Sequence, residues 1–426
     1  MSNWSVLSQK ILYGWLIIIT ILSATAFFLH VVSPQFADIW KTYTIIYLAL
    51  LALNSWYIMV LVIYSDIKAP AKKKISDQLM TVIIPSYNEK LDLLAKTVES
   101  VLNAKGNKQI IIMDDGSTNN SPWLMDILAK RSNITLHRFD KNQGKREALH
   151  YAVSNLVDPN SFCVITIDSD TILDRDALVK IAAPLLADEV GATTGNVLLL
   201  NEKKNLLTRM AGTYYWMGLN IYKKAQSGIG NVVCCSGCLS AYKTSLFKSI
   251  IDEFNSQTFL GEKATHSEDR HLTNLILRRS YKVIYVDDAV CYTETPETLW
   301  GFCRQQLRWK RGYVRESLYT LSYAWKNQRR LFFQILFWDL TAPYITLGLR
   351  LYILTMLIIS PAFVLFIVLP LWIAAMLMRY VIVIMRAPEK IPGLFIYAFF
   401  FELILYWVNL YALLTVRNKR WVTRGI

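Results

Sequence analysis

Acidic side chains follow three separate apolar runs of this 426-residue chain. They are Glu89 after LMTVIIPSYN, Asp114 and Asp115 after KQIIIM, and Asp168 and Asp170 after FCVITI. A single acidic turn would be typical of a solvated loop, because Asp and Ser are common in turns. Three such turns at the ends of successive strands favour a ligand site, since open α/β sheets bind ligands where their strands end.

The third run predicts a metal site. Asp168 and Asp170 alternate, so in an extended chain both side chains face the same side. Carboxylate oxygens beside a phosphate suit Mg²⁺ or Mn²⁺. Such an ion neutralises the charge that builds up on a departing phosphate group. We therefore expect Mn²⁺ or Mg²⁺ at this position.

The segments between the acidic turns predict strand–helix–strand units. LDLLAKTVESVLNA (91–104) has a helical pattern and separates the first two strands. We therefore expect Asn88 and Glu89 to share one crevice with the two aspartates after the second strand. KNQGKREAL (141–149) places Lys145 and Arg146 at an apparent helix start, where free N–H groups and cations suit phosphate. A capped surface helix would explain this fragment equally well.

The composition excludes an ordinary soluble enzyme, because the mean hydropathy is +0.29 and 54% of the residues are hydrophobic. Residues 11–32 and 42–64 carry no formal charge, and each run is long enough to cross roughly 30 Å of hydrocarbon as a helix. We predict two transmembrane helices. A cleaved signal peptide is the alternative for the first, but its apolar run is too long. Residues 75–325 have the short apolar runs of a globular domain, and 331–416 return to a lipid-like composition.

The net charge of +14 could suggest nucleic acid, but many basic residues lie at the edges of the apolar segments. They are Lys68, Lys72, Lys73, Lys74, Lys326, Arg329, Arg330, Arg386, Lys390, Arg417, Lys419 and Arg420. This distribution is typical of cytosolic membrane flanks. It predicts a cytosolic globular domain held against anionic lipid, with no nucleic-acid partner.

Three cysteines cluster at Cys234, Cys235 and Cys238. No second Cys/His pair follows at the spacing of a zinc site. We expect reduced thiols that pack or line a site in a reducing cytosol.

With these motifs in this order, the chain resembles the processive family-2 glycosyltransferases, and among them the rhizobial chitin-oligosaccharide synthases and the hyaluronan synthases. The resemblance covers residues 75–320. It implies an α/β fold, a cytosolic GT-A (Rossmann-like) domain inserted between transmembrane helices. The expected parts are two N-terminal transmembrane helices (1–67), the GT-A domain (68–295), amphipathic interface helices (296–345) and a C-terminal transmembrane and re-entrant region (346–426).

The resemblance also implies roles for the acidic turns. In this family the PSYNE and DDGS elements hold the uridine of a UDP-sugar, which here assigns Tyr87, Glu89 and Asp115. Lys145 matches the lysine near the diphosphate. Asp168 and Asp170 match the Asp-x-Asp motif, whose second aspartate is the metal ligand.

The stretch SEDR (267–270) matches the element that carries the family's general base. The resemblance assigns Asp269 as the base that takes a proton from the acceptor hydroxyl, with Glu268 as its neighbour. The same stretch predicts a helix N-terminus with Ser267 as its cap and acids favoured by the helix dipole. Both interpretations can hold, because a helix start is a rigid place for a base.

RQQLRWKRGYVRES (304–317) resembles the family's Gln-x-x-Arg-Trp element, with Gln305, Arg308 and Trp309 on one face of a helix. Indole stacks on sugars and arginine binds diphosphate oxygens bidentately. Arg315 trails the motif, as in hyaluronan and chitin-oligosaccharide synthases. The alternative is that Trp309 anchors an interfacial helix at the lipid headgroups.

Two more elements resemble the family. GNVVCCSGCLSAY (230–242) matches the acceptor-site loop, which assigns Cys235 to substrate binding. Cys238 stands where the family usually has proline, which leaves the shape of the acceptor pocket open. WVTR (421–424) matches an element beside the active site and assigns Trp421 and Arg424.

The resulting hypothesis is a multi-pass enzyme of the plasma (inner) membrane. It uses UDP-N-acetylglucosamine to build and export a chitin-type chain, with the UDP-sugar, the growing polysaccharide and membrane lipids as partners and no obligatory protein partner. A hyaluronan synthase that also uses UDP-glucuronate stays open. A transferase acting on a lipid phosphate is disfavoured by the Gln-x-x-Arg-Trp element, and a nucleotide-binding regulator with a dead site is disfavoured by Asp170, Asp269 and Trp309.

The last hydrophobic stretch, 393–416, is long enough to cross a bilayer but carries Glu402 and Asn409 near its middle. Basic residues flank both ends, which disfavours a single crossing. We predict that it re-enters the membrane or lies along the cytosolic interface as broken helices.

Overall fold

The computed structural model describes residues 42, 62–63, 75, 77–130, 133–400 and 404–418. They fall into two compact units. The sheet unit contains the described residues from 75 to 258 and Glu262–Thr298. The helical unit contains 42, 62–63, Phe259–Gly261 and the described residues from 299 onward. The predicted membrane helices at 11–32 and 42–64 lie outside the described residues, apart from 42, 62 and 63.

The sheet unit is built on one eight-stranded sheet with the order β3-β2-β1-β4-β7-β6-β10-β5. Its strands are β1 (Met80–Ser86), β2 (Lys108–Asp114), β3 (Ile134–Arg138), β4 (Cys163–Thr166), β5 (Ile172–Leu173), β6 (Val190–Leu199), β7 (Ser240–Lys243) and β10 (Lys282–Thr293). The neighbours from β3 to β4 are parallel, and β7 is antiparallel to β4 and β6. β10 is parallel to β6 and antiparallel to β5. Two short strands, β8 (Thr258–Phe259) and β9 (Glu262–Lys263), lie outside this sheet.

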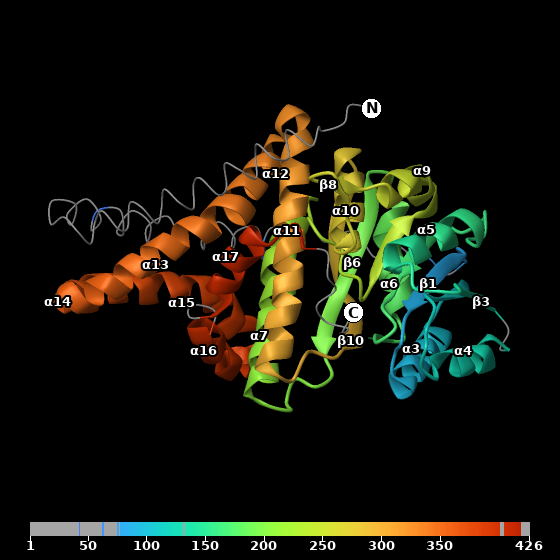
Figure 1. Cartoon of the computed structure of the whole chain (residues 1–426), viewed down its shortest axis with the longest axis horizontal. Coiled ribbons are helices and arrows are strands. Elements are labelled where there is room, and N and C mark those ends of the chain that lie inside the picture. The colour runs from blue at the N-terminus through green and yellow to red at the C-terminus, as the bar shows by residue number, and fades with distance from the viewer. Residues whose placement is uncertain are drawn as a thin grey trace. The chain divides into compact units, whose positions relative to one another are not determined.

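Helices pack on the sheet because its central strands are apolar on both faces. All seven residues of β1 are buried, which is typical of a parallel sheet covered on both sides. α5 (Lys145–Asn155), α9 (Thr244–Asn255) and α10 (Glu268–Arg278) contact one another in series and pack on the strands (Figure 1). The other helices of the unit are α3 (Leu91–Asn103), α4 (Ser121–Ala129), α6 (Ala177–Ala182), η2 (Ala183–Leu186), α7 (Leu206–Met217), the π-helix η3 (Gly218–Lys223) and α8 (Lys224–Gly228).

The strand order reverses between β1 and β4. β2 and β3 lie on one side of β1, and β4 lies on the other. In doubly wound sheets, ligands bind outside the carboxyl ends of the strands at such a switch point. The turns that follow Ser86, Asp114 and Thr166 therefore meet at the position where the sequence predicts a site.

One strand is shorter than the sequence predicted. The apolar run 162–171 was expected to stay extended through both aspartates, but β4 ends at Thr166. The backbone N–H of Thr171 donates to the carbonyl of Asp168 at 3.1 Å, which closes a turn. The prediction that Asp168 and Asp170 alternate along an extended chain was therefore wrong, and they share a turn instead.

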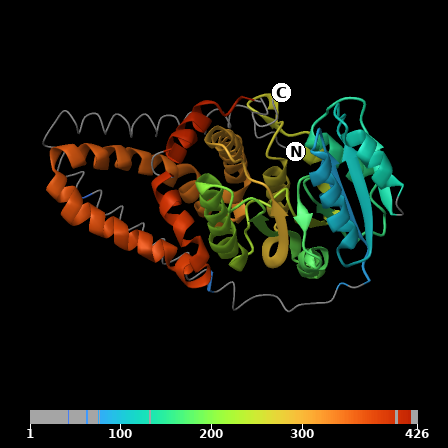
Figure 2. The same cartoon turned by 90° about the horizontal axis from the view of Figure 1, so that it is seen from below.

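The helical unit consists of α11 (Leu299–Asn327), α12 (Arg329–Gln334), η4 (Ile335–Thr341), α13 (Ala342–Ile359), α14 (Pro361–Phe363), η5 (Val364–Val368), α15 (Leu369–Arg386), η6 (Pro388–Lys390), α16 (Ile391–Phe400) and α17 (Tyr406–Leu414). Within this unit, α13 and α15 form a long arm that turns at α14 (Figure 2). Among the residues that the structure describes, no helix is both long and apolar enough to cross a membrane. The segment 393–416 falls on α16 and α17, and residues 401–403 between them, with Glu402, lie outside the description.

Candidate active site

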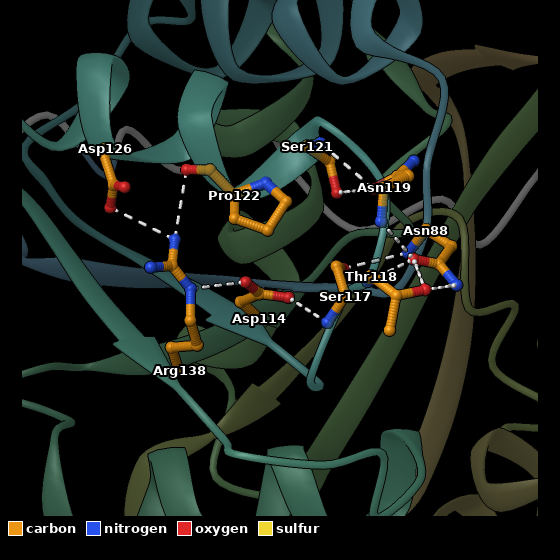
Figure 3. Close-up of polar contacts among 9 residues, drawn as sticks. All are labelled: Asn88, Asp114, Ser117, Thr118, Asn119, Ser121, Pro122, Asp126 and Arg138. Carbon is orange, nitrogen blue, oxygen red and sulfur yellow. Dashed lines mark hydrogen bonds and ion pairs between the residues drawn. The ribbon is translucent and has the colours of Figure 1, made fainter.

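Asn88 ties the turn after β1 to the turn after β2 (Figure 3). Its side-chain oxygen accepts the backbone N–H groups of Thr118 at 2.7 Å and Asn119 at 3.2 Å, and its own N–H donates to the Ser117 hydroxyl at 3.0 Å. Asn88 has a φ of 50°, in the left-handed region that Asn tolerates better than most residues. These bonds fix the adjacent Glu89 relative to the second turn.

Asp114 shapes the second turn from inside (Figure 3). Its carboxylate is fully buried and accepts the N–H of Ser117 at 3.0 Å and the guanidinium of Arg138 at 2.7 Å. Arg138 also donates to the carbonyl of Pro122 and the carboxylate of Asp126, both at 3.1 Å. The Asp114 side chain therefore stabilises the turn after β2. The side chain of Asp115 faces the segment that leads into α5.

Asp115 binds the loop that leads into α5. Its two carboxylate oxygens accept the N–H groups of Gln143 at 2.7 Å and Gly144 at 2.9 Å. Gly144 has a φ of 94°, a conformation that glycine adopts without strain. The loop can therefore turn sharply and begin α5 at Lys145.

The turn that carries the two later aspartates is tied to the same place. The hydroxyl of Ser169 donates to Glu89 at 2.8 Å, and the hydroxyl of Thr97 donates to the carbonyl of Ser169 at 3.0 Å. Asp168 and Asp170 flank Ser169 and are half-buried. The turn therefore lies beside Glu89, as the resemblance implied.

Lys145 joins two of the acidic elements. Its ammonium lies 2.5 Å from the carboxylate of Asp168 and 3.4 Å from that of Glu268. Burial opposes the charged form of Lys145, but Asp168, Glu268 and Asp269 together raise its pKa above the usual value. Lys145 therefore stays protonated among several carboxylates. Its neighbour Arg146 turns away.

Arg146, the second cation of the 141–149 helix start, does not point toward Lys145 and the acidic cluster. Its guanidinium is buried and donates to the carbonyl of Phe254 at 2.5 Å and the side chain of Gln257 at 2.8 Å. The guanidinium carbon also lies 4.8 Å from the centre of the Phe254 ring. Arg146 therefore packs α5 against the end of α9 and the segment that follows it.

Asp269 lies in the first turn of α10, beside Glu268. Burial and the charge of Glu268 raise the pKa of Asp269 to about 6, against the lowering effect of Lys145. A carboxylate with a raised pKa at a ligand site is typical of a general acid or base.

Ser267 differs from the expected cap. It occupies the position before α10 with φ 62° and ψ 38°, and its side chain makes no capping hydrogen bond. A left-handed conformation is uncommon for serine and marks strain that often lies at functional sites. The turn therefore directs the chain into α10 through its backbone.

The predicted acceptor loop, residues 230–242, lies beside Asp269. The thiol of Cys234 is 3.9 Å from Asp269, and burial raises its pKa. The N–H of Cys235 donates to the hydroxyl of Thr273 at 2.9 Å, which in turn donates to the carbonyl of Asp269 at 2.8 Å. The Cys235 side chain is fully buried, and burial raises the pKa of its thiol to about 11. Its assignment to substrate binding stays a prediction.

The donor set suits a divalent cation that is shared with a substrate. In the described part of the chain, no group of three or more His, Cys, Asp or Glu side chains could hold a metal ion. Asp168 and Asp170 offer two carboxylates from one turn, and Mg²⁺ is usually bound by one or two carboxylates together with substrate phosphates. The residues present therefore fit a divalent ion, and its binding to Asp170 stays a prediction.

The remaining predicted residues lie on α11, directly after β1, or outside the described residues. Gln305, Arg308 and Trp309 lie on α11 of the helical unit, at the helical spacing that the sequence predicted. Arg315 is also on α11, where its guanidinium is buried and lies 2.9 Å from the buried carboxylate of Glu316. Trp421 and Arg424 lie outside the described residues. Tyr87 is half-buried directly after β1 in the sheet unit.

Sequence reasoning missed Arg138 and Gly237. A Cβ at position 237 would lie 2.9 Å from both the Asp168 carboxylate and the Lys145 ammonium, so only glycine lets the loop approach them this closely. The Ser-Gly-Cys segment could have signalled it. Arg138 became visible only through the pairing of β3 with β2.

Comparison with known proteins supports the glycosyltransferase family that the sequence motifs resemble. The chain matches the model of glycosyl transferase family 2 over residues 81–251. It is 32% identical over 356 residues to an N-acetylglucosaminyltransferase of Azorhizobium caulinodans, covering 80% of this chain and 86% of that protein. It is 31% identical over 356 residues to an N-acetylglucosaminyltransferase of Rhizobium leguminosarum bv. viciae, covering 81% of each.

A solved structure supports the fold. A mannosyltransferase from Pyrobaculum calidifontis, in complex with GDP-Man and Mn²⁺, is similar with a TM-score of 0.57 and 18% identity, over 80% of this chain and 98% of that chain. This confirms the predicted α/β GT-A, Rossmann-like fold. The family match and the relatives that span most of its length show that the chain belongs to glycosyl transferase family 2 and is a glycosyltransferase.

Proposed function

We propose that this protein is a membrane-embedded, inverting and processive enzyme that transfers N-acetylglucosamine from its UDP-sugar to a growing β-linked, chitin-type chain and exports that chain. The observation that carries the proposal is the cluster of Lys145, Asp168, Glu268 and Asp269. The names of the similar rhizobial enzymes support the choice of sugar.

In this proposal, Asp269 takes the proton from the acceptor hydroxyl while the hydroxyl oxygen attacks the anomeric carbon of the donor. The bond from that carbon to the diphosphate oxygen breaks on the opposite face, so the configuration inverts and UDP leaves. Lys145 faces the diphosphate and offsets its charge. Tyr87, Glu89 and Asp115 lie around the predicted nucleoside site.

Asp170, with Asp168 beside it, would hold the Mn²⁺ or Mg²⁺ cofactor. The ion supplies charge neutralisation on the departing diphosphate when it is bound. The similar mannosyltransferase was solved with Mn²⁺, which supports a divalent ion here. We expect EDTA to abolish transfer and Mn²⁺ or Mg²⁺ to restore it. Asp170→Ala should stay inactive with excess metal. Full activity of the wild type in chelator would show that the reaction does not need the metal.

The proposed location is the plasma (inner) membrane, with the sheet unit in the cytosol. Large apolar side chains on the α13–α15 arm are exposed, including Ile358 at 84% and Phe366 at 77%. Such exposure is costly in water and suits contact with lipid. In the proposal, the Gln-x-x-Arg-Trp face of α11 binds the acceptor chain, and Trp421 and Arg424 lie near it.

A cysteine added after Ile426 tests the topology. It should resist a membrane-impermeant maleimide in intact cells and react in inverted vesicles, beyond the labelling of the parent protein. Labelling from outside the cell would refute a cytosolic C-terminus.

A hyaluronan synthase is the second candidate function. The doubled glutamine of RQQLRW and the trailing Arg311 and Arg315 resemble that group as well as the chitin-oligosaccharide synthases, which keeps it open. Purified protein incubated with UDP-N-acetylglucosamine, with and without UDP-glucuronate, separates the two. A product that forms from the first donor alone and is cut by chitinase supports the proposal. A product that needs both donors and is cut by hyaluronidase supports the second candidate, and no sugar transfer from either mixture would contradict both.

A further inference from the structure

Lys223 is a half-buried cation close to the active site that sequence reasoning did not single out. It ends the π-helix η3, between α7 and α8. Its ammonium donates to the hydroxyl of Ser236 at 2.6 Å. Wide helical turns of this kind are rare and are frequent at functional sites.

The neighbouring lysine shows how unusual this pairing is. Lys224 forms an ion pair with Asp287 at 2.6 Å. Across the described residues, Lys223 has no carboxylate partner and is bonded only to the neutral hydroxyl of Ser236. A half-buried charge normally recruits a carboxylate, because burial without one is costly. A short charge-assisted bond to a hydroxyl therefore suggests a role beyond stability.

Ser236 is the central fixed point of the acceptor loop. Its N–H donates to the hydroxyl of Thr194 at 2.9 Å, and its carbonyl accepts the hydroxyl of Ser240 at 2.6 Å. The bond from Lys223 adds a third anchor from a different element. The backbone and the side chain of Ser236 are thereby both held.

The residues on either side of Ser236 touch the two halves of the reaction site. On one side, the thiol of Cys234 lies 3.9 Å from Asp269. On the other, Gly237 packs so closely on Asp168 and Lys145 that a Cβ would lie 2.9 Å from each of them. A shift of the loop at Ser236 would therefore move it against both the proposed base and the proposed diphosphate site.

We propose that Lys223 is a positioning residue for sugar transfer. Acting through Ser236, it holds residues 234–237 at the distance from Asp168 and Asp269 that the reaction needs. This inference rests on the proposed function, because it assigns the loop to the acceptor side of a transfer reaction. It predicts a larger effect on turnover than on donor binding.

Kinetics of five variants test this role. We expect Lys223→Met to lower kcat about tenfold while KM for UDP-N-acetylglucosamine changes less than about twofold. Ser236→Ala should reproduce this pattern, and the double variant should be no worse than the weaker single variant, because both changes break one interaction. Lys223→Arg should keep about half of the activity, since it restores a charged donor. Lys224→Met, which removes a neighbouring charge, is the matched control and should keep wild-type kcat for the folded protein.

Amide hydrogen exchange provides a readout that does not need activity. The amides of residues 234–237 should exchange faster in Lys223→Met and Ser236→Ala than in the wild type. The amides of the rest of the sheet should exchange at the wild-type rate. Unchanged exchange and kcat in Lys223→Met would overturn the inference. So would a tenfold rise in donor KM in Lys223→Met alone, which would make Lys223 a direct donor ligand. If the wild type transfers no sugar, the proposed function fails while the exchange experiment still decides whether Lys223 holds the loop.

Discussion

Lys145 in the sheet unit and Arg315 in the helical unit are both cations beside carboxylates, yet their surroundings differ. Lys145 lies near Asp168, Glu268 and Asp269, its side chain is 17% exposed, and the carboxylates raise its pKa. Arg315 is 5% exposed and pairs with the fully buried Glu316. The group around Lys145 carries an excess of negative charge, so its carboxylates can still bind a cation and a proton. The second group pairs two buried charges of opposite sign, which suits holding a helix in place.

The largest expected effect comes from the base. We expect Asp269→Asn to lower the rate of sugar transfer by about 10² to 10⁴, the usual cost of a lost general base. UDP affinity, measured by titration calorimetry, should be unchanged, because the base contacts the acceptor and not the nucleotide. Asp252→Asn, at a side chain that is 93% exposed on α9, is the control and should retain transfer. An Asp269→Asn protein with more than about a tenth of wild-type turnover would show that the base lies elsewhere.

The sequence could predict the residues at the strand ends but not all of their directions. Continuous apolar runs located β1, β2 and β4, and the switch point follows from their order. The direction of Arg146 was left open, because its partners Phe254 and Gln257 come from a segment more than a hundred residues away. Contacts between residues so far apart in the chain leave no pattern in the local sequence.

The extended Asp168–Asp170 segment was wrong, for a related reason. The turn is held by Thr97 and Glu89 from other elements, so strand propensity alone could not reveal where β4 ends. Lys223 was missed because its proposed positioning role depends on a π-helical turn and on a hydrogen bond to Ser236, thirteen residues further on.

A second pair of variants sharpens the contrast at Arg315. If Arg315 and Glu316 form a closed structural pair, Arg315→Met and Glu316→Gln should both destabilise the fold, by about 3 to 5 kcal/mol for removing one partner of a buried pair. Thermal melting of the purified protein measures this. The alternative, a substrate-binding Arg315, predicts that Arg315→Met loses transfer without a lower Tm and that Glu316→Gln behaves like the wild type.

A smaller effect is expected at the clamp between the two turns. Asn88→Ala removes the side-chain oxygen that accepts the N–H groups of Thr118 and Asn119. We expect KM for UDP-N-acetylglucosamine to rise about fivefold with kcat nearly unchanged, since each neutral hydrogen bond contributes about 1 kcal/mol. Asn88→Asp keeps an acceptor oxygen and tolerates the same backbone conformation, so it should behave closer to the wild type. An unchanged KM in Asn88→Ala would mean that the nucleoside site does not depend on the clamp.

The central claim is that Asp269 acts as the base within a coupled group of charges, and the pH dependence of kcat/KM tests it most directly. The pKa of Asp269 is about 6, and only its ionised form can accept a proton. Activity should therefore be full above that pH and fall about tenfold per pH unit below it. Lys145→Met removes a charge that lowers the pKa of Asp269, so the acidic limb should move to higher pH in the residual activity of that variant. A profile that stays flat down to about pH 4, or a limb at the same pH in both proteins, would contradict the account.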